Sequence, residues 1–275
     1  MAIAARALTI FSLIVTLVAL GATDASASHA WSSYHWGRTA NPLALTLGDN
    51  VSGTWDAHLA TASADWSSTA YDGKTDPQTG LVVANPLRTS IVPGGTAPRK
   101  CRATSGRVEV CNATYGSNGW LGLAQIWLSG GHIVQGVAKM NDTYFNTEKY
   151  NNGNEKLHVM CQEIGHTFGL GHTSEDGTSQ NTCMDYFSNT GANAGSTQST
   201  RPNLHDYGQL TAMYSHFDTV DTAKSPASAA ARGVGGPTGA DGDGTPAGAS
   251  RARGSWYVEH LGGGRYLITH IRWLD

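Results

Sequence analysis

The sequence has little charge of either sign, few cysteines and only one long apolar run. Charged residues make up 14% of the 275 residues, and the formal net charge is -3. Neither nucleic acid nor an anionic membrane is therefore indicated as a partner. Internal repeats and coiled-coil heptads are not evident, so neither a solenoid nor a coiled coil is expected.

The apolar run predicts a secretory signal over residues 1–30. It extends from Ala7 to Leu20, follows Arg6, and is too short for a membrane span. Small residues downstream allow cleavage after Ala27 or after Ala30, and the sequence does not distinguish the two. We expect a secreted, extracellular protein that is soluble and monomeric, with no membrane contact after cleavage.

The mature chain divides into three predicted segments. Residues 31–220 are expected to form one main domain. Residues 221–254 are rich in Ala, Gly, Ser, Pro and Asp, a composition typical of a flexible linker. Residues 255–275 contain two short apolar runs around a glycine triplet and predict a β-hairpin that docks on the domain or on a partner. The predicted site residues all precede residue 221, so we expect truncation there to leave the site intact.

The four cysteines are expected to be oxidised in an exported protein. Cys101 and Cys111 are the nearest pair in the sequence, which leaves Cys161 for Cys183. An alternative interpretation makes Cys161 and Cys183 zinc ligands. It is the weaker one, because nearby histidines already supply a set of ligands.

Hydrophobic periodicity predicts a mixture of strands and helices before and after residue 161, which is typical of the α+β class. Ser52 or Thr54 is expected to begin the first helix and Asn154 the second, while Pro202 opens the third. The expected strands are 43–47, 87–92, 107–110, 122–128 and 132–140, and the expected helices lie near 55–66, 154–168 and 202–217.

The predicted helix near 154–168 carries the residues best suited to chemistry. Gln162 and His166 lie one turn apart on one face, with Glu163 beside them. Gly169 is placed where a helix ends in a left-handed residue, so the chain can turn back and bring His172 to the same point. This arrangement suits a catalytic zinc ion with one open position for water, which Glu163 would polarise as general base.

The stretch Cys161–His172, CQEIGHTFGLGH, resembles the zinc signature H-E-x-x-H-x-x-G-x-x-H of the metzincin metalloproteases, most closely its matrixin version. Every specified position matches except the first, where Gln162 replaces a histidine. The resemblance implies that Gln162, His166 and His172 bind Zn²⁺ and that Glu163 is the general base.

The same resemblance implies a zincin-like fold: a mixed twisted sheet, an active-site helix, a methionine turn and a C-terminal helix. Met184, within Thr182–Tyr186, fits the methionine turn. Tyr186 is spaced like a tyrosine that approaches zinc in astacins and serralysins, as an extra ligand or a stabiliser of the transition state; a packed core tyrosine is the alternative. A substrate peptide is expected to pair with an edge strand formed by Gly122, Leu123, Ala124 and Gln125. An ordinary solvent-facing edge is the other interpretation.

Three functions follow from these residues. The first is a secreted zinc metalloendopeptidase that hydrolyses polypeptide substrates with zinc-activated water. The second is a catalytically inactive, peptide-binding relative, because Gln162 replaces a ligand histidine. The third is a zinc-stabilised structural or adhesive domain. Retention of Glu163 favours the first. A Ca²⁺ requirement is not supported by any motif.

Overall fold

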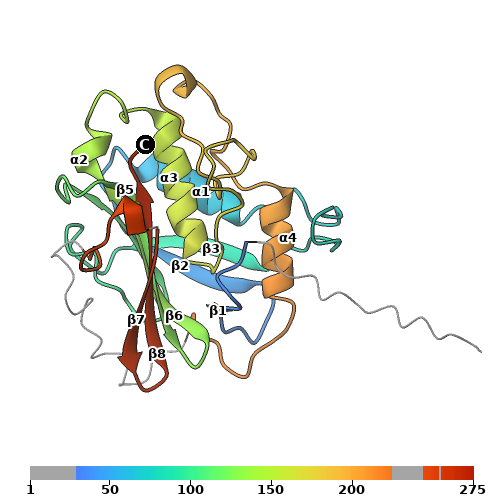
Figure 1. Ribbon diagram of the computed structural model, residues 1–275. Coiled ribbons are helices and arrows are strands. Elements are labelled where there is room, and N and C mark those ends of the chain that lie inside the picture. The colour runs from blue at the N-terminus through green and yellow to red at the C-terminus, as the bar shows by residue number, and fades with distance from the viewer. Residues whose placement is uncertain (1–28, 225–243, 254) are drawn as a thin grey trace, which may run out of the picture.

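The structure is a computed structural model that describes residues 29–224, 244–253 and 255–275 (Figure 1). The predicted signal up to residue 28, and residues 225–243 of the predicted linker, lie outside the described residues. The fold is α+β, with one mixed sheet and few helices, as expected for the class. Among the described residues, no helix has the length and apolar character needed to cross a bilayer.

The eight strands of the described residues form a single sheet with the order β3-β2-β4-β6-β5-β8-β7, and β1 pairs with β6 beside this path. Neighbours from β3 to β6 are parallel, and neighbours from β6 to β7 are antiparallel. The strands are β1 His35–Trp36, β2 Leu43–Asn50, β3 Leu87–Pro93, β4 Val108–Ala113, β5 Trp120–Ser129, β6 His132–Asn141, β7 Trp256–Gly262 and β8 Arg265–Trp273.

The helices α1 and α3 pack against each other, and α3 also packs against β5 and β6. The main apolar core includes buried side chains from these helices and from the sheet. The helices are α1 Asp56–Trp66, α2 Asp142–Phe145, α3 Gly153–His166 and α4 Leu204–Met213, and short 3₁₀ turns lie at Gly191–Asn193 and Arg251–Arg253.

Helix α3 forms where its apolar periodicity predicts it, but it begins earlier than expected. The side chain of Asn152, not Asn154, accepts a hydrogen bond from the Glu155 backbone N–H and caps the first turn. After Thr167 the chain passes through Gly169, which has a φ of 98°. A side chain at Gly169 would collide with the carbonyl oxygen of Tyr34. The predicted turn after the helix is therefore confirmed.

Two other helix boundaries differ from the predictions. Helix α1 has Trp55 at its N-cap, without a side-chain capping bond, so neither Ser52 nor Thr54 begins it. Helix α4 starts from a capping box between Asn203 and Asp206. It ends at Met213, and 61% of Phe217 is exposed beyond it, so Phe217 does not share the buried helix face.

Both predicted disulfides are present, which is consistent with a secreted protein. Cys101 pairs with Cys111 across a Cα–Cα distance of 6.0 Å, and Cys161 pairs with Cys183 across 5.9 Å. The second bridge ties α3 to the loop that contains Met184. Because both sulfurs are oxidised, the interpretation of Cys161 and Cys183 as zinc ligands is wrong.

The C-terminal hairpin is confirmed, and its docking place corrects one prediction. Strand β8 pairs antiparallel with β5, so Gly122 lies opposite Met140 on one side and Arg272 on the other. The segment Gly122–Gln125 is therefore an interior part of the sheet and not an edge. Its alternating pattern identifies a strand, but the partner on its second side comes from the far end of the chain.

Candidate metal centre

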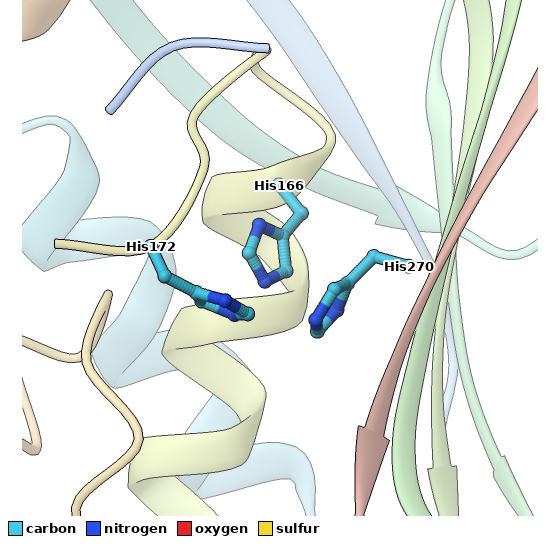
Figure 2. A group of neighbouring side chains, drawn as sticks. All are labelled: His166, His172 and His270. Atoms are coloured by element: carbon cyan, nitrogen blue, oxygen red, sulfur yellow. The ribbon is translucent and has the colours of Figure 1, made fainter. Parts of the chain in front are cut away.

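Three histidines from separate parts of the chain converge beside α3 (Figure 2). His166 lies in the last turn of α3, His172 follows the Gly169 turn, and His270 projects from β8. One ring nitrogen from each lies within 4.8 Å of the others. The sequence predicted the first two members of this group and missed the third.

Each imidazole is held through one nitrogen while the other nitrogen is left without a partner. The Nδ1 atoms lie 2.8 Å from the carbonyl oxygen of Leu170 for His166, 2.8 Å from Oε1 of Glu175 for His172 and 3.5 Å from Oε2 of Glu163 for His270. All three Nε2 atoms are buried and have no hydrogen-bond partner among the residues that the structure describes. Acceptors of this kind fix the Nδ1–H tautomer of a metal-binding histidine and leave Nε2 as the donor.

The surroundings keep these rings neutral, which is the form that binds a metal. Burial lowers the pKa of His166 and His270 well below the ordinary value, and each is further lowered by a neighbouring histidine of the group. Burial also lowers the pKa of His172, against the opposing effect of its hydrogen bond to Glu175.

Glu163 lies next to the group and is fully buried. Its Oε2 is 3.5 Å from His270 Nδ1, while Oε1 has no hydrogen-bond partner. Burial raises the pKa of the Glu163 carboxyl well above the ordinary value, and the charge of Arg272 opposes this shift. The carboxylate has room because residue 122 is glycine: a side chain there would collide with Glu163 Oε1 and with Val159.

Gln162, the expected first ligand, has other partners in this conformation. Its Nε2 donates to the carbonyl oxygen of Asp185 at 2.7 Å, and its Oε1 accepts from Arg272 Nη1 at 2.8 Å. Arg272 belongs to β8, two residues after His270, so both side chains project from the same face of the strand. The hairpin thus supplies a third histidine and at the same time holds the oxygen of Gln162.

Met184 lies against α3, and Tyr186 lies against one histidine of the group. Met184 is fully buried below α3, and a side chain at Gly165 would come within 2.5 Å of its sulfur. The ring of Tyr186 contacts His172 with centroids 4.7 Å apart. Its hydroxyl lies 2.8 Å from Ser255 Oγ and donates to the carbonyl oxygen of Ile271 at 3.1 Å, so here it is bonded to the C-terminal segment.

Two tryptophans cover the histidines. Trp31 stacks on His166 with an interplanar angle of 8°, and Trp256 of β7 contacts the rings of His166, His172 and His270 at centroid distances of 5.3, 5.6 and 4.4 Å. A peptide would have to displace the hairpin to reach Glu163. The site is therefore closed in this conformation.

Truncation at residue 221 would remove His270 from this group, whereas His166, His172 and Glu163 precede that point, so the expected tolerance of truncation stays a prediction. One signal in the sequence could have indicated β8: His270 and Arg272 alternate with apolar residues in a short strand. Such a pattern is ordinarily assigned to a strand with one solvent-facing side. Both residues are instead fully or nearly fully buried.

Comparison with known proteins adds no assignment, since no protein-family model matches the chain and no curated protein matches its sequence. The function is therefore inferred from the side chains of this centre.

Proposed function

We propose that the protein is a secreted, metzincin-like zinc metalloendopeptidase whose closed form holds zinc through His166, His172 and His270. The observation that carries this proposal is the set of three buried Nε2 atoms without partners, each on a ring whose Nδ1 faces an acceptor. Three neutral imidazoles with one remaining position are a donor set typical of catalytic zinc.

Glu163 would act as the general base of peptide hydrolysis. Zinc, when bound, supplies a Lewis acid that polarises the peptide carbonyl. Glu163 Oε1, which has no partner, would accept the proton of the attacking water and pass it to the leaving amine nitrogen.

Turnover requires the hairpin to leave β5. Strand β8 occupies the main-chain hydrogen-bonding positions on β5 that an extended substrate would use. Release of β8 would also remove Arg272 from Gln162 Oε1. Gln162 lies one helical turn before His166, so it would then be available to replace His270 as the third ligand, as the sequence resemblance implies.

A second candidate is a zinc-binding protein without turnover. The observation in its favour is the closure of the site: Glu163, His166 and His270 are fully buried, and β8 pairs with β5 from Arg265 to Trp273. If the hairpin never leaves, zinc would serve to fasten the C-terminal segment. Peptide binding along β5, the basis of the inactive peptide-binding alternative, would be blocked as well.

The two candidates are separated by nicking the full chain. A specific protease site inserted within residues 225–243 allows the connection to the hairpin to be cut after folding. Peptide cleavage is then measured before and after the cut, together with zinc content. The peptidase proposal expects zinc in the intact protein and a rise in cleavage after nicking under conditions that release the hairpin. The nicked Glu163→Ala protein should bind zinc but remain inactive.

The control for metal content is His260→Ala, because His260 is exposed on β7 and belongs to neither group of potential metal ligands. His172→Ala should lose zinc from the centre, whereas His260→Ala should retain it. Zinc binding with no cleavage before or after hairpin release would refute the peptidase and support the second candidate.

A further inference from the structure

A second cluster of histidines surrounds Asp218, away from the centre beside α3. His35 comes from β1, His132 is the first residue of β6, and His216 follows α4. Their Nε2 atoms lie 3.5, 3.0 and 3.4 Å from Asp218 Oδ1, respectively. For His35, His132 and Asp218, the potential ligand atoms lie within 4.8 Å of one another. His216 is not part of that set, but its Nε2 lies beside the same carboxylate oxygen.

Hydrogen bonding alone does not account for the position of His35. Its Nδ1 lies 2.6 Å from the carbonyl oxygen of Ser33, which can only accept, so Nδ1 carries the proton. The Nε2 atom of the neutral ring then carries no proton and presents a lone pair. It is buried, has no hydrogen-bond partner and faces a carboxylate oxygen. Facing lone pairs of this kind are unfavourable unless a proton or a metal cation lies between them.

The imidazoles of this cluster are close to one another. The ring centroid of His35 lies 5.0 Å from that of His132 and 4.9 Å from that of His216. A single divalent cation between the rings and the carboxylate would bind both the buried His35 Nε2 and Asp218 Oδ1.

Asp218 is itself held in the orientation that a ligand needs. Its Oδ2 accepts a hydrogen bond from the backbone N–H of Arg38 at 2.8 Å, and its own N–H donates to the carbonyl oxygen of Arg38 at 2.7 Å. These bonds direct Oδ1 towards the histidines. Metal-binding carboxylates are commonly oriented by such outer hydrogen bonds.

We propose that His35, His132, His216 and Asp218 bind a second zinc ion. Three imidazole nitrogens and one carboxylate oxygen suit tetrahedral Zn²⁺, and four protein ligands leave no position for substrate, so the site is structural. It would fasten β1 and the segment after α4 to the start of β6. This site is independent of the proposed peptidase function, because it shares no residue with the centre beside α3.

Zinc stoichiometry of the full-length mature chain, measured by elemental analysis after dialysis, tests the proposal. The protein should hold two equivalents, and Asp218→Asn should hold one; the amide introduced by this change would keep an oxygen to accept from Arg38. The control His260→Ala should hold two. In a His172→Ala background, which removes the first centre, one equivalent should remain, and adding Asp218→Asn should remove it.

Two results would overturn the second site. The first is that the His172→Ala protein retains no zinc. The second is that adding Asp218→Asn to the His172→Ala protein leaves its zinc content unchanged. His216→Ala provides a variant that leaves the packing intact, because 54% of the His216 side chain is exposed. In His216→Ala, competition with a chromophoric chelator should show that zinc affinity at the second site falls by about 10-fold or more. Removing a residue that only supports a ligand already costs about that much, so removing a ligand should cost at least as much. Unchanged affinity would exclude the four-ligand site.

Discussion

Arg272 provides the sharpest test of whether the C-terminal hairpin is a structural part of the domain. Only 1% of its surface is exposed. Its guanidinium donates to Gln162 Oε1 at 2.8 Å and to the carbonyl oxygen of Phe187 at 2.6 Å, and it lies 3.8 Å from Oε1 of the fully buried Glu155. Replacement by methionine keeps most of the side-chain volume and removes all of these donors.

The expected loss follows from the charge that remains behind. Removing one partner of a buried ion pair typically costs about 3–5 kcal/mol. Glu155 Oε1 has no hydrogen bond to compensate for the loss of Arg272. For a domain of this size, 1 kcal/mol corresponds to about 2–4 °C in Tm, so Arg272→Met should lower Tm by about 6–20 °C. Burial already raises the pKa of Glu155, against the charge of Arg272, so the variant should favour the protonated form further.

Thermal unfolding followed by circular dichroism, at fixed zinc concentration, measures this effect. Arg265→Met is the matched control, because Arg265 lies on the same strand but is only partly buried; a change within about 0.5 kcal/mol is expected there. Glu155→Gln combined with Arg272→Met should destabilise by less than the sum of the single changes. Hydrogen exchange should accelerate first in β7 and β8. Equal Tm shifts for the two arginine variants would refute the reasoning.

Three further outcomes are expected. Sequencing of the secreted protein should give an N-terminus after Ala27 and not after Ala30, because the backbone N–H of His29 bonds Gln209 Oε1 and the His29 ring is buried. The metal-free protein should lose stability as pH falls below 6.5, because the unfolded chain then protonates His166, His172 and His270, which burial keeps neutral in the fold. The raised pKa of Glu163 opposes this loss, since the folded protein binds one proton that the unfolded chain does not. These four groups contribute a slope of up to about 2.7 kcal/mol per pH unit, so His172→Ala should reduce the slope measured by urea titration, and equal slopes in the parent and the variant would contradict the burial argument. Replacing both Cys161 and Cys183 by serine should lower the free energy of unfolding by about 3 kcal/mol, and an unchanged denaturation midpoint would show that the bridge does not constrain the unfolded chain.

Local sequence patterns were sufficient to predict the helices, turns and hairpins whose formation depends on a few neighbouring residues. The apolar spacing of α3, the turn at Gly169 and the glycine triplet of the terminal hairpin each act over a few residues, and each predicted element is present. Both disulfides follow from short separations in the sequence, 10 and 22 residues. Helix starts were less accurate, since Asn152 and Asn154 are equally good caps by type and packing selects between them.

The partner of β5 could not be predicted in the same way. A strand pattern specifies which side chains share a face, but it does not specify which strand pairs with it. His270 and Arg272 look like the solvent-facing side of a hairpin, and their burial depends on docking against α3. The strand Gly122–Gln125 was accordingly assigned to an edge, because the strand that covers it lies more than a hundred residues later.

Docking of β8 also couples metal binding to the fold. If His270 is a zinc ligand, zinc binds the docked hairpin better than the undocked one, and docking must strengthen zinc binding by the same free energy. Arg272 and His270 project from one strand towards Gln162 and Glu163, so a change that loosens either contact weakens the other. Zinc at 100 times its dissociation constant would stabilise the docked state by about 2.7 kcal/mol. That is less than the loss of about 3–5 kcal/mol expected for Arg272→Met, so zinc at this concentration should restore only part of the stability of that variant. Full restoration would mean that His270 holds the hairpin more firmly than the buried guanidinium does.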